Sequence, residues 1–219
     1  MLNEFITIKE NVQTQIVEKK SKFIANLFYI ENPKQAEESI KAIKKQYFDA
    51  KHNCVAYRVI NETGQIIEKS NDDGEPSGTA GSPMLSILQK NNLINVLVIV
   101  TRYFGGILLG TGGLVRAYSE STLSAIQKAT KIEKHLGEIY EITLNYSEFD
   151  NFRYYCKKNQ ININNVEYKE DIVCRIEIEE NKKDRFIREY KTKKLNIKNL
   201  QYLSKKYIDK SKSNNSFYE

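Results

Sequence analysis

The sequence contains few cysteines and no long apolar run. Its three cysteines, Cys54, Cys156 and Cys174, are an odd number without a C-x-x-C pair, which argues against a disulfide framework and a zinc site. We expect three buried thiols. No apolar stretch approaches the length of a membrane span, and the N-terminus lacks the basic start, apolar run and cleavage site of a secretory signal. These absences predict a soluble, cytoplasmic protein without a membrane partner.

Proline and glycine are missing from the last part of the chain. All three prolines and nine of the ten glycines precede residue 132, and neither residue type occurs after Gly137. The length of 219 residues suits two small domains better than one large one. We therefore predict a first domain over residues 1–134, a second over 135–210, and a frayed tail over 211–219.

Positive charge is concentrated near the C-terminus. The formal net charge is +6, and residues 182–212 contain twelve Lys or Arg against three acidic residues. Such an excess favours a polyanionic partner, because each cation can neutralise a phosphate. The candidate nucleic-acid-binding residues of this segment are Lys193, Lys194, Lys205 and Lys206.

The first domain is predicted to mix strands and helices. Residues 12–17 and 22–30 alternate as in an antiparallel hairpin, and a helix follows that Asn32 caps and Pro33 begins. Residues 94–103, INVLVIVTRY, are apolar on both sides, as in a central strand covered on both faces. A further helix is predicted over residues 114–130.

The stretch TRYFGGILLGTGGLVRAY, residues 101–118, holds five of the ten glycines. It predicts a strand, a glycine-rich turn and a helix beginning near Gly112 or Gly113, where free N–H groups and the helix dipole can bind an anion. It matches no nucleotide motif in full, because Thr111 replaces the P-loop lysine and Val115 replaces the last glycine of G-x-G-x-x-G. The candidate anion-binding or phosphate-binding residues are Arg102, Gly105, Gly106, Gly110, Thr111, Gly112, Gly113 and Arg116.

The alternative is a structural role, in which these glycines only supply positive φ and close packing. The two arginines distinguish the interpretations. If the helix start holds an anion, Arg102 and Arg116 should have free side chains there. If the loop is structural, they should pair with Asp72, Asp73 or Glu75.

A second group of candidates comprises His52, Cys54, Asp72, Asp73, Glu75 and Thr79. The acidic loop DDGEPSGTAGSP offers hard oxygen ligands, but it lacks the spacing of a calcium loop, so a capped turn is the preferred interpretation and no metal is predicted. His52 and Cys54 share one strand face and could form a thiolate pair. The sequence shows no signature of a third residue that would complete a catalytic group with them. We therefore prefer the interpretation that Cys54 is a core cysteine and His52 a partly buried histidine. We assign no catalytic residue and no cofactor.

Four segments carry a resemblance to a known family. SKFIA (residues 21–25), HNCVAYR (52–58), DDGEPSGTAGSP (72–83) and VTRYFGGILLGTGGLVRAY (100–118) occur in the order seen in the YigZ/IMPACT family. The resemblance covers about residues 11–130. It implies that the first domain has the left-handed βαβ fold of the second domain of small-subunit ribosomal protein S-five.

The second domain resembles the ferredoxin-like domain V of elongation factor G. The pattern agrees with this, because strands over residues 138–144, 161–168, 172–178 and 195–202, with helices over 148–158 and 183–193, give the order βαββαβ. The expected fold class is thus α+β with two domains.

The resemblance constrains function less than fold. Eukaryotic members regulate translation by competing for the activator of the kinase that senses uncharged tRNA, but they use an additional N-terminal domain that this sequence does not contain. The leading hypothesis is a non-enzymatic RNA- or ribosome-binding protein associated with regulation of translation. The alternatives are a small enzyme acting on a phosphorylated or nucleotide substrate through the glycine loop, and a protein-interaction module.

Overall fold

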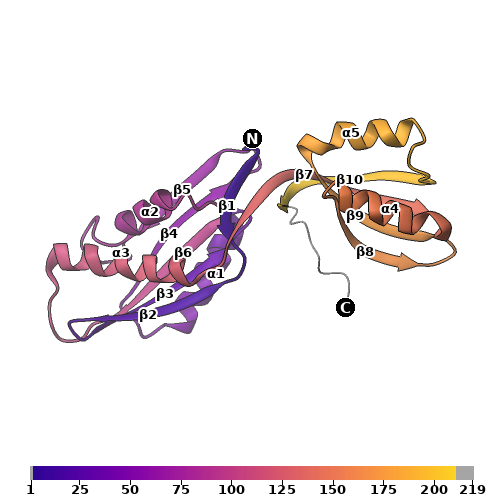
Figure 1. Cartoon of the computed structure of the whole chain (residues 1–219). Helices are drawn as coiled ribbons and strands as arrows, with labels where there is room; N and C mark the ends of the chain where they lie inside the picture. The colour runs from indigo at the N-terminus through magenta and orange to yellow at the C-terminus, as the bar shows by residue number, and fades with distance from the viewer. Residues whose placement is uncertain (1, 211–219) are drawn as a thin grey trace. The chain divides into compact units, whose positions relative to one another are not determined.

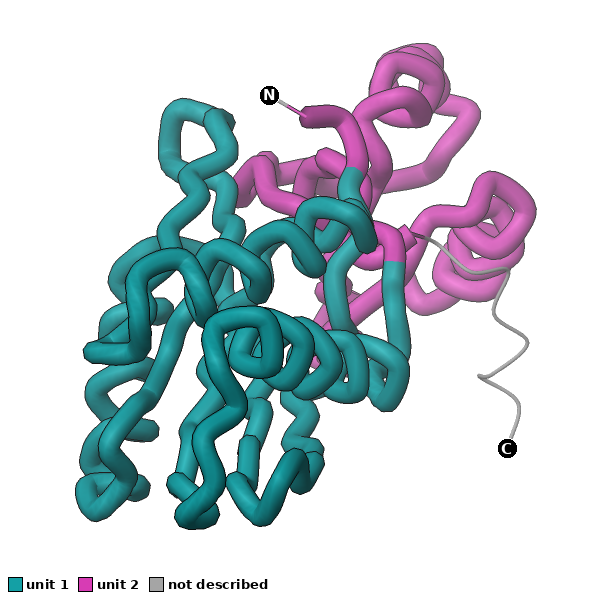
Figure 2. The backbone as a smooth tube through the Cα atoms, turned by 90° about the vertical axis from the view of Figure 1, so that its left-hand side faces the viewer, with its two compact units in different colours: residues 1, 5–132 teal, residues 2–4, 133–219 magenta. Residues whose placement is uncertain are grey.

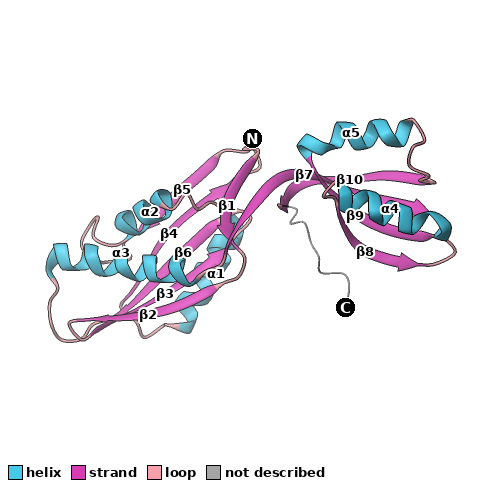
Figure 3. Ribbon diagram, viewed as in Figure 1, coloured by secondary structure: helices cyan, strands magenta, loops and turns pink. Residues whose placement is uncertain are grey.

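The computed structural model describes residues 2–210, and the predicted frayed tail of residues 211–219 lies outside the described residues. The chain forms two compact units, one of residues 5–132 and one that joins residues 2–4 to the chain from residue 133 onward (Figure 2). The units divide two residues before the predicted boundary. Figures 1 and 3 show the strands and helices of each unit.

The first unit is built on a five-stranded antiparallel sheet. Its strands, in spatial order, are β2 (Val12–Glu18), β3 (Ser21–Tyr29), β6 (Val96–Tyr103), β4 (His52–Ile60) and β5 (Ile66–Asn71). Both β3 and β4 run antiparallel to β6, so they are parallel to each other. Helix α1 (Pro33–Gln46) provides the crossover between them. As predicted, Asn32 caps α1, because its side chain accepts the N–H of Gln35 at 2.9 Å.

Helices cover both faces of this sheet. On one face, Val98 and Val100 pack in a cluster with residues of α2 (Gly81–Lys90) and α3 (Gly110–Lys128). On the other, Leu97 and Ile99 pack with residues of α1. The prediction that β6 is buried on both sides is therefore confirmed, and this double burial makes β6 the centre of the core.

Helix α3 begins earlier than predicted. Its first residue is Gly110, with φ of +71°, and its last is Lys128, whereas the sequence indicated a start near Gly112 and an end at Thr130. Glycine has a low helix propensity, so a first turn that contains three glycines is not predicted as helix from the sequence pattern. Gly112 thus lies inside the helix.

The second unit has the predicted βαββαβ order. Its elements are β7 (Lys131–Leu144), α4 (Tyr146–Lys158), β8 (Asn162–Tyr168), β9 (Ile172–Glu179), α5 (Glu180–Lys191) and β10 (Asn199–Asp209). The strands lie in the order β10, β7, β9, β8, and β1 (Glu4–Ile8) also pairs with β7. Phe149, Phe152 and Phe186 of the two helices pack against the sheet. This arrangement confirms the α+β class and the ferredoxin-like second domain.

Two strand predictions are wrong in extent. Strand β7 begins at Lys131, not at residue 138, and β10 runs from Asn199 to Asp209, not over residues 195–202. Leu195 and Ile197 pack against the core from the loop after α5. Their alternation resembles that of a strand, but β10 is placed by its ladder with β7.

Candidate functional site

Predicted site residues from distant parts of the chain meet at one end of the first sheet. Because β6 is antiparallel to β3 and β4, its last residues lie beside the first residues of both, and Arg102 is the register partner of Phe23 and His52. The acidic loop (residues 72–79) and the glycine loop (residues 104–109) approach the same place, since Asp73 contacts Asn53 and Gly105 contacts Ser21. We call this region the glycine-loop end of the sheet.

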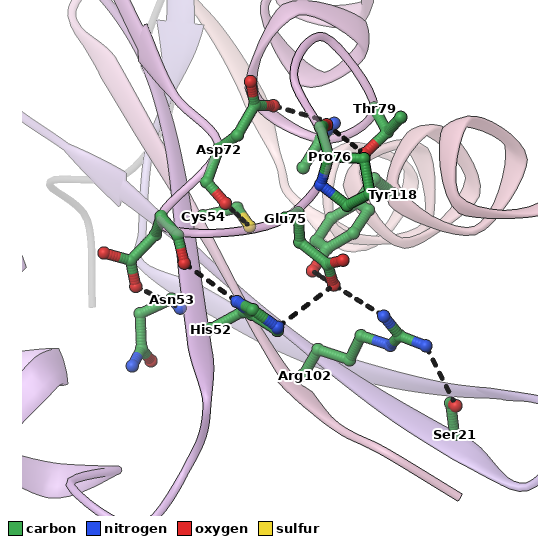
Figure 4. Close-up of polar contacts among 12 residues, drawn as sticks. Ser21, His52, Asn53, Cys54, Asp72, Glu75, Pro76, Thr79, Arg102 and Tyr118 are labelled. Carbon is green, nitrogen blue, oxygen red and sulfur yellow. Dashed lines mark hydrogen bonds and ion pairs between the residues drawn. The ribbon is translucent and has the colours of Figure 1, made fainter. Parts of the chain in front are cut away.

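The buried carboxylate of Glu75 is the centre of a polar network (Figure 4). Arg102 Nη1 donates to Glu75 Oε1 at 2.7 Å, and the hydroxyl of Tyr118 donates to the same oxygen at 2.8 Å. His52 Nε2 lies 4.0 Å from it. The side chains of Glu75 and Arg102 are only 3% and 8% exposed. A carboxylate this deeply buried requires such partners, because an unpaired buried charge is strongly unfavourable.

Arg102 has the environment of a structural residue. Its guanidinium lies 5.5 Å from the ring centre of Phe23 and 5.8 Å from that of Phe104, and Nη2 lies 3.5 Å from Ser21 Oγ. Pairing with Glu75 is the arrangement expected of a structural loop. Arg102 is therefore not the free cation that an anion site requires.

The acidic loop is a turn whose carboxylates accept hydrogen bonds from the protein. Asp72 accepts the backbone N–H of Gly78 within the loop at 2.8 Å, and at the start of α2 it accepts those of Ala80 at 3.0 Å and Gly81 at 2.8 Å. Burial raises the pKa of Asp72, but these three donors outweigh burial and hold it below its usual value. Asp72 thus fixes the loop to the helix that follows it.

The remaining loop candidates are also engaged within the protein. Asp73 Oδ2 accepts the N–H of Asn53 at 2.7 Å, and its Oδ1 pairs with Lys44 at 2.6 Å. The hydroxyl of Thr79 donates to the carbonyl of Pro76 at 2.6 Å. The carboxylate oxygens of Asp72 and Asp73 and the hydroxyl of Thr79 therefore have partners within the protein, as in a capped turn.

His52 and Cys54 lie on the same face of β4 and contact the acidic loop. His52 Nδ1 is 2.8 Å from the carbonyl oxygen of Asp73, and Cys54 Sγ donates to that of Asp72 at 3.0 Å. Burial raises the pKa of Cys54 to about 12, so the thiol is protonated at neutral pH and is a poor nucleophile. All three cysteines are buried and free, which confirms that prediction.

Two positions of the loop have a backbone conformation or a close contact that only glycine allows. Gly106 has φ of +84°, and a Cβ on Gly105 would lie 2.0 Å from the carbonyl carbon of Lys20. The N–H of Gly105 donates to Ser21 Oγ at 3.2 Å. Gly112 differs, because its φ is ordinary and a Cβ there would meet nothing within 4 Å. The loop is therefore held tightly against the β2–β3 turn, while the helix start beyond it is open.

The start of α3 retains features of an anion site. Leu109 occupies the N-cap without a capping side-chain bond, and the first turn contains no acidic residue. Arg116 is exposed and has no ion-pair partner within residues 2–210. Gly112 and Gly113 precede Arg116 by four and three positions, so they share its face of the helix, and no side chain of theirs separates Arg116 from the helix start.

The four candidate lysines of the second unit do not form one patch. Lys205 pairs with Glu180 at 3.0 Å, and Lys206 pairs with Glu177 at 3.7 Å. As neighbours on β10 they point to opposite faces of the sheet. Lys193 and Lys194 lie in the loop before β10 and have no ion-pair partner in the described part of the chain. Lys205 lies six residues into the strand, roughly 20 Å from its first residue.

Several residues of the site were not among the predicted ones. Tyr118 could have been found, because its buried position on α3 implies a hydroxyl that needs a partner. Ser21 belongs to the SKFIA segment, but nothing in the sequence indicates its contact with Gly105. Lys19 and Lys20, both with positive φ, form the β2–β3 turn against the glycine loop. They are exposed, without ion-pair partners among residues 2–210.

Comparison with known proteins agrees with this architecture. Residues 19–126 match the Impact N-terminal domain, and residues 142–189 match a domain of unknown function, DUF1949. The IMPACT family member YvyE of Bacillus subtilis is 40% identical over 85% of either chain. The IMPACT family member YigZ of Escherichia coli is 32% identical over 72% of this chain and 78% of its own.

A solved structure described as that of a hypothetical protein aligns with a TM-score of 0.61 and 27% identity, covering 93% of this chain and 99% of its own. No helix in the described part of the chain is long and apolar enough to cross a bilayer. The two matched domains and the identity to relatives over most of their length show that the chain belongs to the IMPACT family.

Proposed function

We propose that this protein is a non-enzymatic RNA- or ribosome-binding protein of the cytoplasm, associated with regulation of translation, and that it contacts RNA phosphate at the start of α3. The observation that carries the proposal is the exposed Arg116 beside an uncapped helix N-terminus without acidic residues in its first turn. A cation near the positive end of the helix dipole is electrostatically unfavourable unless an anion lies there too. The arrangement therefore favours a bound phosphate.

The charges around this helix start support a polyanionic ligand. Nearby carboxylates are engaged, since Asp73 pairs with Lys44 and Glu75 with Arg102. Lys20 of the adjacent turn has no such partner in the described chain. The glycine-loop end thus presents unpaired cations beside two carboxylates that already have partners, and the net charge of +6 adds long-range attraction.

The absence of an enzymatic role is part of the proposal. The groups that a catalytic site at this end would use are occupied in holding the loops, because Glu75 binds Arg102 and Tyr118 while Cys54 is a buried, protonated thiol. The link to translation rests on the family, whose eukaryotic members regulate that process.

Salt-dependent binding tests the proposal. A fluorescent RNA of about 20 nucleotides is longer than the roughly 4–16 nucleotides that one OB-fold domain covers, and its affinity for the whole protein should fall with increasing salt. Arg116→Gln should weaken binding and reduce the magnitude of the log–log salt slope by about 0.7–0.9, the value for one phosphate contact. Arg153→Gln, which changes an exposed arginine of α4 in the other unit, is the matched control. An Arg116→Gln protein with the wild-type melting temperature, affinity and slope would exclude the helix start from binding.

A further inference from the structure

The glycine loop exposes three large apolar side chains within five residues. Phe104 is 55% exposed, Ile107 42% and Leu108 82%. Single exposed apolar residues are common on soluble proteins, whereas three in one short loop are typical of a surface that binds a partner. These three residues, which we call the apolar ridge, lie between the end of β6 and the start of α3.

The ring of Phe104 is supported from one side. The guanidinium of Arg102 lies 5.8 Å from its centre, and Arg102 is itself fixed by the buried carboxylate of Glu75. The next residue, Gly105, is held by Ser21 and packs directly on Lys20. An aromatic ring that is fixed yet half-exposed binds a partner with little loss of conformational entropy.

Cations border the apolar ridge on two sides. Lys19 and Lys20 lie in the turn against Gly105, and Arg116 lies on the helix that follows the ridge. All three are exposed and lack an ion-pair partner among residues 2–210. The surface thus combines an aromatic face with unpaired cations, which fits a ligand that carries both planar rings and negative charge.

We propose that Phe104 is a stacking platform for an unpaired base, and that the ligand of the glycine-loop end is single-stranded RNA, with its phosphates at Arg116, Lys19 and Lys20. This inference rests on the proposed function and specifies its ligand. Aromatic platforms beside cationic grooves are the general means of binding single strands. A duplex conceals the faces of its bases and hides their edges in a deep, narrow groove, so Phe104 cannot stack on them.

A tryptophan at the platform gives a direct test, because the sequence has no tryptophan. Phe104→Trp places the protein's single tryptophan on the ridge, where its emission can be excited apart from that of the tyrosines, and stacking against a base should quench it. We expect single-stranded RNA to quench this fluorescence and a duplex of the same sequence to leave it largely unchanged. Tyr154→Trp, at a 70% exposed position on α4, is the control and should not be quenched. Equal quenching of the Phe104→Trp protein by both RNAs, or no quenching by either, would overturn the stacking platform.

Affinities separate this inference from the proposed function. Phe104→Leu retains an apolar side chain but removes the aromatic face, so it should weaken single-strand binding by about 5- to 150-fold, the range for one stacked base, and leave duplex binding unchanged. If Arg116→Gln weakens binding and Phe104→Leu does not, the stacking platform is wrong but the proposed RNA-binding function is retained. If the wild-type protein binds neither RNA, the platform and the proposed function both fail. Circular dichroism of each variant verifies that it is folded.

Discussion

Arg102 and Glu75 form an ion pair of 2.7 Å between side chains that are almost entirely inaccessible to water. The pair joins the end of β6 to the acidic loop, and its two residues lie 27 positions apart in the chain. It gives the glycine-loop end a rigid base on which the more exposed residues, Phe104 among them, are held.

Removing one partner of this pair should destabilise the protein strongly. Glu75→Ala leaves the buried guanidinium of Arg102 without its counter-ion, and we expect a loss of about 3–5 kcal/mol in the free energy of unfolding. Glu75→Gln should cost less, because its amide oxygen can still accept hydrogen bonds. Urea unfolding followed by circular dichroism measures both. Glu167→Gln breaks an exposed pair with Lys169 and should cost far less, because water screens that pair. Equal losses for Glu75→Ala and Glu167→Gln would contradict the structural role of the buried pair.

Gly105 of the glycine loop and Gly112 of α3 should respond in opposite ways to alanine. Gly105→Ala brings a methyl group to 2.0 Å from backbone atoms of Lys20, so the loop or the β2–β3 turn must move and the melting temperature should fall. Gly112→Ala meets nothing within 4 Å and lies in the first turn of α3. It should raise stability by up to about 1 kcal/mol, because alanine favours helix over glycine. Thermal melts of the two variants form a matched pair, and equal destabilisation would be inconsistent with an open position at Gly112.

Asp72 should contribute to the loss of stability in acid. Its pKa lies below the usual value in the folded protein, so its contribution is present above pH ~4 and is lost as the pH falls through the folded pKa. Asp72→Asn should therefore lower stability at pH 7 and flatten the decline between neutral and acid pH. Denaturant unfolding at a series of pH values measures the slope. Asp150→Asn, at a highly exposed position, is the control. A wild-type slope in the Asp72→Asn protein would show that the three backbone donors do not depend on ionised Asp72.

The lysines of the second unit should differ in their effect on RNA binding. Lys205 and Lys206 already pair with Glu180 and Glu177, whereas Lys193 and Lys194 have no such partners in the described residues. The double variant Lys193→Gln with Lys194→Gln should flatten the salt dependence more than Lys205→Gln with Lys206→Gln. Titrations of one fluorescent RNA at several salt concentrations compare them. The reverse ranking would show that the ion pairs on β10 open when RNA binds.

Periodicity and capping were sufficient to predict much of the fold. The continuous apolar run of β6 indicated burial on both faces, and the Asn32–Pro33 pair located the start of α1, since both signals act within a few residues. The first turn of α3 was missed because its glycines carry no side-chain pattern. Strand β10 was misplaced because Leu195 and Ile197 pack as a strand would, although they lie outside the ladder with β7.

The candidate site was harder to predict than the fold. The sequence singled out both Arg102 and Glu75, but whether they pair depends on how the acidic loop folds over the end of β6, and no local signal specifies that contact. The four lysines show the same limitation. Their charge was evident from composition, but the strand geometry that separates their faces comes only from the register of β10 with β7.

The contact between Gly105 and Lys20 bears on attempts to exchange segments between relatives of this protein. A chimera that receives a foreign glycine loop but keeps its own β2–β3 turn, or the reverse, would have to reproduce a backbone approach that leaves no room for a single methyl group. The two segments lie more than 80 positions apart in the chain. In any graft they should be transferred together, as one module.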